Sequence, residues 1–298
     1  MRSPINTDPK RRQASAGYWT FGAGFALLLL LYWRPLWRLA TFAWSSDLYS
    51  YIVLVPVISG YLIWLRRDKL PPPAPEASGA AASLAASGVA LLAAGWALGP
   101  RPEGSALTAY VASLLLFLCG LTVAALGIAT FRRTLFPILF LALMIPLPGP
   151  LATRLELAMQ SGSADVAYGI FRAVGTPVFL QGLTFQLPGI TIEVAPECSG
   201  IRSTFALFIT SLVAANLLLN SNWRRLVLVA VVVPLAVLRN GFRVFVVGQL
   251  CVTKGPQMID SYIHRRGGPY FFLLSLVPLI VVLVVLMRFE RKGTKGEI

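Results

Sequence analysis

Charged residues, histidine and cysteine are all scarce in this 298-residue sequence. Charged side chains make up 13% and hydrophobic ones 56%, against about 25% and about 45–50% in an ordinary soluble domain. One histidine, His264, excludes a multi-histidine metal site. The three cysteines, Cys119, Cys198 and Cys251, are too scattered for a disulfide scaffold or a Cys-x-x-Cys metal site. The composition therefore argues against a soluble globule, and it indicates neither a metal nor an organic cofactor.

Long apolar runs predict an all-α polytopic membrane protein, because roughly 20 apolar residues fill a bilayer core of about 30 Å. We predict about eight transmembrane helices, at Trp19–Ala43, Tyr49–Leu65, Gly79–Leu98, Ala106–Thr130, Thr134–Leu147, Ser203–Leu219, Leu226–Val246 and Pro269–Met287. The fifth run is short and contains two prolines, so it is expected to be a thinned or broken crossing. The first run is too long for the core of a cleavable signal peptide.

The net charge of +14 is better explained by membrane topology than by a nucleic-acid partner, because most basic residues lie at the ends of apolar runs. Basic clusters recur at every second turn, at Arg2 with Lys10–Arg12, at Arg66–Lys69, at Arg132–Arg133, at Arg224–Arg225 and in the tail. By the positive-inside rule, both termini are expected in the cytoplasm. Arg34 and Arg38, near the outer end of the first run, count against this assignment.

This topology predicts a single integral membrane catalytic domain over residues 19–287, between a cytoplasmic N-terminal tail at 1–18 and a basic cytoplasmic tail at 288–298. One long outer insertion, at 148–201, belongs to that domain. Within it, Leu151–Val174 carries too many charges for a lipid-exposed span, which favours an amphipathic helix at the membrane interface. Alternating apolar and polar residues on both sides of Pro188-Gly189 then predict a small β-hairpin before Cys198.

Cys198, Arg243 and His264 fall at the same predicted outer surface although they lie on different segments. Cys198 precedes a helix, with Ser199 and Gly200 between, and a helix N-terminus favours the reactive thiolate. The alternative is that a lone membrane cysteine is a small buried hydrophobe. We expect that alternative for Cys119 and favour it for Cys251.

Two arginines, Arg239 and Arg243, are four residues apart and share one helix face. An arginine within a span indicates function by default, but either one could also extend to the lipid headgroups. Their spacing does not choose between them. A cysteine, a histidine and an arginine together supply the nucleophile, proton carrier and oxyanion stabiliser that attack on an amide requires.

The segment Glu193-Val-Ala-Pro-Glu-Cys-Ser-Gly-Ile-Arg-Ser203, followed by Asn240-Gly-Phe-Arg243 and then by His264 with Gly267, resembles the exosortase/archaeosortase family of membrane cysteine transpeptidases. The resemblance implies that Cys198 is the nucleophile, Arg243 the catalytic arginine of an Asn-x-x-Arg motif, and His264 the catalytic histidine. The residues expected to support them are Asn240, Ser199, Gly200, Arg202 and Arg239.

What the resemblance implies is a sorting enzyme of a bacterial inner membrane, with its catalytic residues at the outer, periplasmic face. Its partners would be exported proteins with a C-terminal sorting signal: a Pro-Glu-Pro-like motif, a transmembrane helix and a basic cluster. A thioester would pass the new C-terminus to an acceptor, such as a lipid or polysaccharide, and such enzymes are often associated with exopolysaccharide production. Two alternatives stay open: a hydrolytic thiol protease, and a non-enzymatic component of exopolysaccharide assembly or transport in which Arg239 and Arg243 bind an anionic lipid or sugar phosphate.

Overall fold

The structure is a computed structural model that describes residues 9–46, 48–75, 78–99, 105–194, 200–261 and 267–295. It is mostly helical, in agreement with the predicted polytopic all-α membrane protein. The chain divides into two compact units, Met1–Gly149 and Pro150–Ile298. The single domain predicted over residues 19–287 runs through both units and stays a prediction.

Six helices in the described part of the chain are long and apolar enough to cross a membrane, or seven if one broken pair counts as a single span. The six are Ala14–Leu31, Gly79–Leu98, Ala106–Leu126, Ile201–Leu218, Asn222–Lys254 and Gly268–Arg291, and the broken pair is Ile128–Met144 with Gly149–Val174. The count of eight is therefore not reproduced. One reason is that the helix in the second run contains only 13 residues, too few to cross alone.

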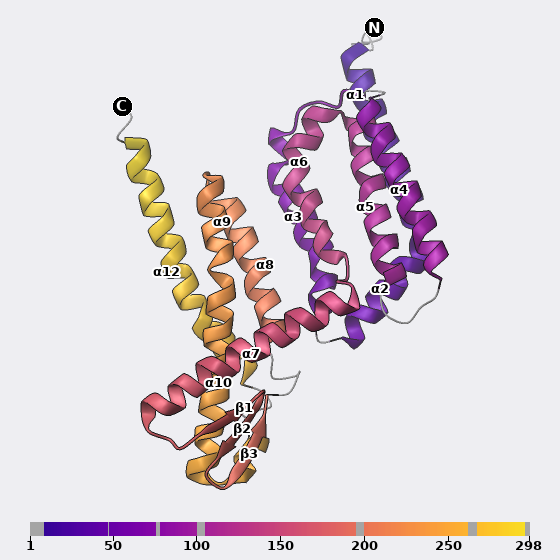
Figure 1. The fold of residues 1–298 in the computed structure, drawn as a ribbon. Helices are drawn as coiled ribbons and strands as arrows, with labels where there is room; N and C mark the ends of the chain where they lie inside the picture. The colour runs from indigo at the N-terminus through magenta and orange to yellow at the C-terminus, as the bar shows by residue number, and fades with distance from the viewer. Residues whose placement is uncertain are drawn as a thin grey trace. The chain divides into compact units, whose positions relative to one another are not determined.

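The first unit contains the elements coloured indigo to magenta in Figure 1. They are α1 (Pro9–Leu31), α2 (Trp33–Ser45), η1 (Ser50–Val53), α3 (Leu54–Arg66), η2 (Arg67–Lys69), α4 (Gly79–Leu98), α5 (Ser105–Leu126), α6 (Ile128–Phe140) and η3 (Leu141–Met144). Helices α4 and α5 run side by side, and α3 packs beside α6. Ser59 on α3 joins the second pair by donating to the carbonyl oxygen of Pro137 across 2.8 Å.

The predicted span Trp19–Ala43 is two helices rather than one, because the chain breaks at Tyr32. Pro35, in the first turn of α2, has no N–H with which to continue the hydrogen-bond ladder of α1. Arg34 and Arg38 consequently lie on α2, beyond the end of the span formed by α1.

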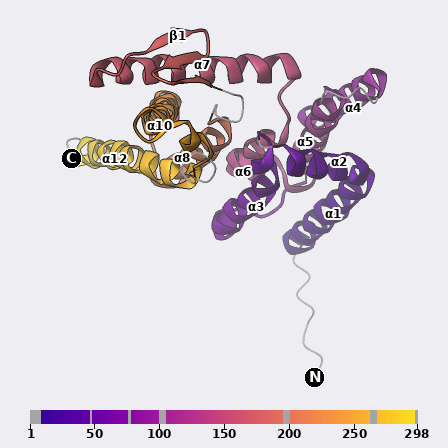
Figure 2. The same cartoon turned by 90° about the horizontal axis from the view of Figure 1, so that it is seen from below.

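The second unit contains α7 (Gly149–Val174), β1 (Phe179–Gln181), β2 (Thr184–Leu187), β3 (Ile190–Glu193), α8 (Ile201–Leu218), α9 (Asn222–Ala230), α10 (Val232–Lys254), η5 (Pro256–Asp260) and α12 (Gly268–Lys295). Helix α10 lies between α7 on one side and α8 with α12 on the other (Figures 1 and 2). The predicted span Leu226–Val246 puts Arg239 and Arg243 near its end. Because α10 continues to Lys254, both arginines instead lie well inside a helix.

The strands form an antiparallel sheet in the order β1-β2-β3. The β2 and β3 strands pair across Pro188-Gly189, with Phe185 opposite Ile192, and β1 is a third strand that the sequence analysis does not include. Phe185 packs in a buried cluster with Ala167 and Phe171 of α7, and Val244 and Phe245 of α10 lie against it. The sheet and α7 are thus fastened to the helix that carries both arginines.

Glycines let α7 approach α10 closely. A Cβ at Gly241 would lie 2.5 Å from Cγ1 of Val166 and 2.9 Å from the carbonyl oxygen of Ser163, and one at Gly248 would lie 2.6 Å from the ring of Phe171. Helix α7 is therefore packed against protein along one face. The interfacial position predicted for Leu151–Val174 stays a prediction.

At the opposite end of α8, an ion pair joins two basic regions that the sequence analysis assigns to the cytoplasm. Glu290 accepts from the backbone N–H groups of Asn220 and Ser221 and from Nη1 of Arg224, the last across 3.1 Å. Because α12 runs to Lys295, most of the predicted basic tail at 288–298 is helical.

Candidate functional site

Arg239 connects α10 to the start of α8. Its side chain is buried, with 7% of its surface exposed. Nη2 donates to the carbonyl oxygen of Gly200 across 3.0 Å and to Oγ1 of Thr204 across 3.3 Å. Nη2 is thus satisfied and holds the residue that follows Ser199, whereas Nη1 is buried and forms no hydrogen bond with the residues that the structure describes.

Gly200 occupies a position that only glycine fits. Its φ of +68° is left-handed, which costs a residue with a Cβ about 1–2 kcal/mol. A Cβ there would also lie 2.6 Å from Oδ1 of Asn240 and 3.0 Å from Nη2 of Arg239. The chain therefore enters α8 in direct contact with the Arg239–Asn240 turn of α10.

The carbonyl of Gly200 is held from its own helix as well. It accepts from the backbone N–H of Thr204 across 3.0 Å, and from Oγ1 of Thr204 and Oγ of Ser203, each across 2.9 Å. These bonds all end on the Gly200 carbonyl, at the start of α8. Together with Arg239 they fix the backbone immediately after the Cys198 segment.

The other end of that segment is fixed from α7. Nε2 of Gln160 donates to the carbonyl oxygen of Val194 across 3.1 Å, and the backbone N–H of Val194 donates to the carbonyl oxygen of Leu183 across 2.9 Å. Gln160 and Val194 are both buried, each 2% exposed. Val194 and Gly200, the described residues on either side of positions 195–199, are thus both held by hydrogen bonds.

A buried hydrogen bond between Asn240 and Ser163 connects α10 to α7 next to these anchors. Nδ2 of Asn240 donates to Oγ of Ser163 across 3.1 Å, and Oγ of Ser163 donates to the carbonyl oxygen of Met159 across 2.7 Å. Asn240, the first residue of the Asn-x-x-Arg motif, therefore has a structural role in joining the two helices.

The structure describes some of the expected site residues and not others. Arg243 lies one helical turn after Arg239 on α10 and is half-buried, while Arg202 is exposed in the first turn of α8. Cys198, Ser199 and His264 lie outside the described residues. His264 belongs to the connection between η5, which directly follows α10, and α12. Of the other cysteines, Cys251 is buried and Cys119 half-buried, as expected for small apolar side chains.

A family model described as transmembrane exosortase (Exosortase_EpsH) matches residues 43–281. The chain belongs to the transmembrane exosortase family. The match begins in α2, ends in α12 and includes Cys198, Arg243 and His264, and with the apolar helices it identifies an integral membrane protein. Comparison with curated proteins and with solved structures gives no match.

Three polar residues of this candidate site, Gln160, Ser163 and Thr204, are not among the residues predicted from the sequence. Gln160 and Ser163 lie on the buried face of α7 with Ala164, Ala167 and Phe171. The spacing of that face, i, i+3, i+4 and i+7, is typical of a helix packed against protein. This pattern indicates a buried face, whereas the charges elsewhere on α7 favour the membrane interface.

No group of three or more histidine, cysteine, aspartate or glutamate side chains able to hold a metal ion occurs among the residues that the structure describes. The polar groups around Gly200 and Val194 instead hold backbone, and they fix the two described residues that flank positions 195–199.

Proposed function

We propose that the chain is an exosortase-type cysteine transpeptidase that cleaves the C-terminal sorting signals of exported proteins and transfers their new C-termini to an acceptor. The observation that carries the proposal is the anchoring of Val194 by Gln160 and of Gly200 by Arg239, on the two sides of Cys198. A catalytic nucleophile has to be held within a fraction of an ångström of its productive position. Membership of the exosortase family supports the same function.

In this mechanism the Cys198 thiolate attacks the scissile carbonyl carbon and forms a C–S bond. The carbonyl electrons move onto oxygen, and the guanidinium of Arg243 stabilises the resulting oxyanion. When the C–N bond breaks, His264 gives its proton to the departing amine and a thioester remains. An amine of the acceptor then attacks the thioester, loses its proton to His264 and releases the thiolate.

The two arginines have different roles in this proposal. Arg239 is a positioning residue, because Nη2 is engaged by Gly200 and Thr204. Arg243, half-buried one turn further along α10, is assigned the oxyanion. The residues alone left this choice open, and the buried position of Arg239 supports the assignment that the family resemblance implies.

The membrane gives the proposed reaction its geometry. The chain acts in a bacterial inner membrane with both termini in the cytoplasm and the site at the periplasmic surface. A substrate with a Pro-Glu-Pro-like motif, a transmembrane helix and a basic cluster diffuses laterally until its motif reaches the site at the height of the membrane interface. The acceptor is a lipid or polysaccharide, in keeping with a role in exopolysaccharide production.

The test compares C-terminal peptides of exported membrane proteins, by mass spectrometry, in cells that carry the wild-type chain, Cys198→Ala or Cys251→Ala. Cys251→Ala is the matched control, because it removes a buried thiol from α10 without touching the proposed nucleophile. We expect a defined set of proteins to keep its C-terminal helix only in the Cys198→Ala cells. Identical C-termini in all three, with each variant accumulating normally, would overturn the proposal.

The same spectra distinguish transfer from hydrolysis. Transfer adds the mass of an acceptor to each trimmed C-terminus, whereas hydrolysis by a thiol protease leaves a free carboxylate. We propose transfer. An unmodified carboxylate on every trimmed protein would show hydrolysis instead, and the chain would then be a thiol protease.

A further inference from the structure

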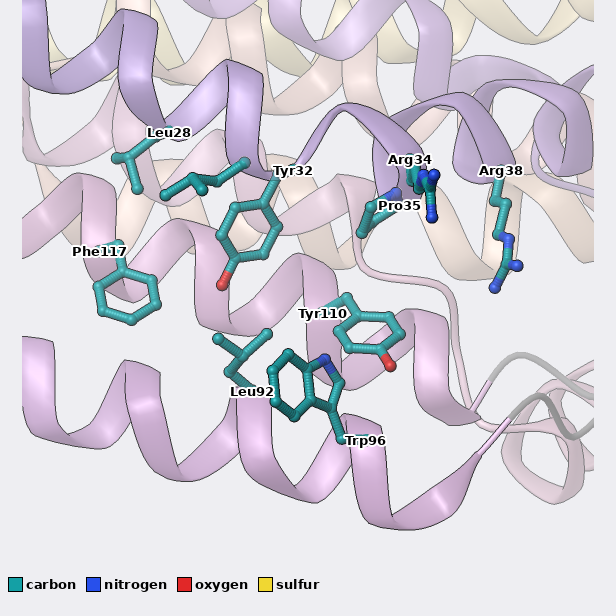
Figure 3. Close-up of a pocket in the computed structure, with 10 residues that line it drawn as sticks. Leu28, Tyr32, Arg34, Pro35, Arg38, Leu92, Trp96, Tyr110 and Phe117 are labelled. Carbon is teal, nitrogen blue, oxygen red and sulfur yellow. The ribbon is translucent and has the colours of Figure 1, made fainter.

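The first unit contains a cavity of about 690 Å³ between α1, α2, α4 and α5, within the range of about 300–1,000 Å³ typical of ligand pockets. Its apolar walls are formed by Leu28, Tyr32, Leu92, Trp96, Tyr110 and Phe117, and its polar side by two arginines of α2 (Figure 3). None of these residues belongs to the site proposed for catalysis.

The aromatic wall of the cavity is held in place by polar contacts. Ser113 donates to the carbonyl oxygen of Tyr110 across 2.8 Å, so the hydroxyl of Tyr32, 2.7 Å from Oγ of Ser113, is the donor of that pair. The ring of Tyr32 also meets the ring of Phe117 edge to face, with centroids 6.3 Å apart. The cavity is therefore lined by side chains with fixed positions.

Glycines on α4 receive the rings that α5 presents to the cavity. A Cβ at Gly95 would lie 2.8 Å from the ring of Tyr110, and a Cβ at Gly88 would lie 3.2 Å from that of Phe117. The two glycines are seven residues apart on α4, as the two rings are on α5, so both rings rest against one face of α4. Small residues at such contacts let helices pack closely within a membrane.

Arg34 and Arg38 give the cavity a charged end. Both are exposed on α2, four residues apart, and lie at the end of the cavity opposite Leu28 and Phe117 (Figure 3). Among the described residues, none that lines the cavity is acidic and neither arginine forms an ion pair. Among the residues that the structure describes, the cavity thus combines an apolar interior with two arginines that form no ion pair at one end.

The character of α2 places that end at the height of the lipid headgroups. The helix buries Leu39 and exposes Trp33, Trp37 and Trp44, each by 60% or more. Tryptophan and arginine side chains gather at the boundary between acyl chains and headgroups, and an amphipathic helix of this kind lies along it.

We propose that this cavity binds one acidic glycerophospholipid, with an acyl chain between α1, α4 and α5 and the headgroup phosphate at Arg34 and Arg38. Guanidinium groups bind phosphate oxygens through paired, charge-assisted hydrogen bonds. A transmembrane peptide helix does not fit: 20 residues with a diameter of about 10 Å and a length of about 30 Å occupy about 2,400 Å³, several times the volume of the cavity.

The test is native mass spectrometry of the purified full-length chain, titrated in detergent with dioleoylphosphatidylglycerol or dioleoylphosphatidylcholine. The wild-type chain is expected to retain one phosphatidylglycerol and to bind phosphatidylcholine more weakly. Arg34→Gln/Arg38→Gln should bind phosphatidylglycerol at least about tenfold more weakly, because two charge-assisted contacts are lost. The matched control is Arg132→Gln/Arg133→Gln, which removes the same charge from an exposed basic pair in the same unit and should bind as the wild type does.

A second variant, Leu92→Trp, fills the apolar part of the cavity and leaves both arginines in place. It should also lose the bound phosphatidylglycerol, and thermal unfolding in the same detergent shows whether each variant is folded. Equal binding of both lipids to the wild type, equal loss in both double variants, or full binding to a folded Leu92→Trp would each overturn the proposal.

Discussion

Nη2 of Arg239 lies 3.0 Å from the carbonyl oxygen of Gly200, so a buried arginine on α10 holds the first turn of α8. This contact joins the Asn-x-x-Arg helix to the residue two positions after the proposed nucleophile. The charged side chain of Arg239 therefore fixes backbone, and we assign stabilisation of the oxyanion to the neighbouring Arg243.

Replacing the two arginines separately should distinguish positioning from catalysis. In Arg239→Met, the amides of residues 201–204 should exchange hydrogen about ten- to hundredfold faster, because a bond to a charged donor contributes about 1.5–3 kcal/mol. Trimming of exported proteins should also fall. In Arg243→Met, trimming should fall while exchange at these amides stays at the wild-type rate. Hydrogen exchange combined with C-terminal proteomics measures both, and faster exchange in Arg243→Met alone would reverse the two assignments.

Gly200→Ala should destabilise the second unit and abolish trimming. The substitution adds the cost of a left-handed backbone to a Cβ 2.6 Å from Oδ1 of Asn240. The control is Gly182→Ala in the turn between β1 and β2, where φ is +62° and no atom lies within 4 Å of the added Cβ. Left-handed strain of about 1–2 kcal/mol is common to both, so denaturant unfolding should show a larger loss for Gly200→Ala. Equal losses of unfolding free energy in the two variants would mean that the contact with Asn240 does not contribute to stability.

Gln160→Met should reduce trimming although Gln160 is on a different helix from every residue of the family motifs. Methionine fills the same space but cannot donate to the carbonyl of Val194, which leaves a buried acceptor unsatisfied at a cost of about 1–3 kcal/mol. Gln186→Met, at an exposed position of β2, is the control and should trim normally. If Gln160→Met cells trim exported proteins as wild-type cells do, the anchor at Val194 is not needed for function.

Gly241→Ala tests the close approach of α7 to α10. Its Cβ would meet Val166 and the backbone of Ser163 at 2.5 and 2.9 Å, and overpacking of this kind costs about 1–3 kcal/mol. Gly169→Ala, on α7 with nothing within 4 Å, should instead gain up to about 1 kcal/mol from helix propensity. The free energy of unfolding, measured relative to the wild type, should fall for Gly241→Ala and rise for Gly169→Ala. An unchanged value for Gly241→Ala would contradict the packing described.

The sequence predicts those parts of the fold that depend on composition alone. Gly79–Leu98 is a helix with the predicted bounds, and the spans predicted at Ser203–Leu219 and Pro269–Met287 each fall on one long helix. The span predicted at Ala106–Thr130 runs past the end of α5 at Leu126 into α6. Where a run is interrupted by local geometry, as at Tyr32 and Pro35, a count of apolar residues cannot place the break. Strand β1 is not predicted either, because its three residues are too few to show alternation.

The candidate site divides in a similar way. The types of residue that chemistry requires, with the family motifs, select Cys198, Arg243 and His264 from the sequence. The anchors Gln160, Ser163 and Thr204 are polar residues without a motif, and their importance depends on which backbone carbonyl or side chain each one reaches after folding. The spacing of Gln160 and Ser163 on α7 indicates only that they lie on its buried face; the group that each one contacts cannot be read from a single chain.

The central claim, a thioester on Cys198, is tested most directly by adding hydroxylamine to membranes that carry the wild-type chain and reading the C-termini of the trimmed proteins by mass spectrometry. Hydroxylamine captures a thioester, so we predict that these proteins end in a hydroxamate and that Cys198→Ala membranes yield none. Trimmed C-termini that are the same with and without hydroxylamine, or that persist in Cys198→Ala, would contradict the account.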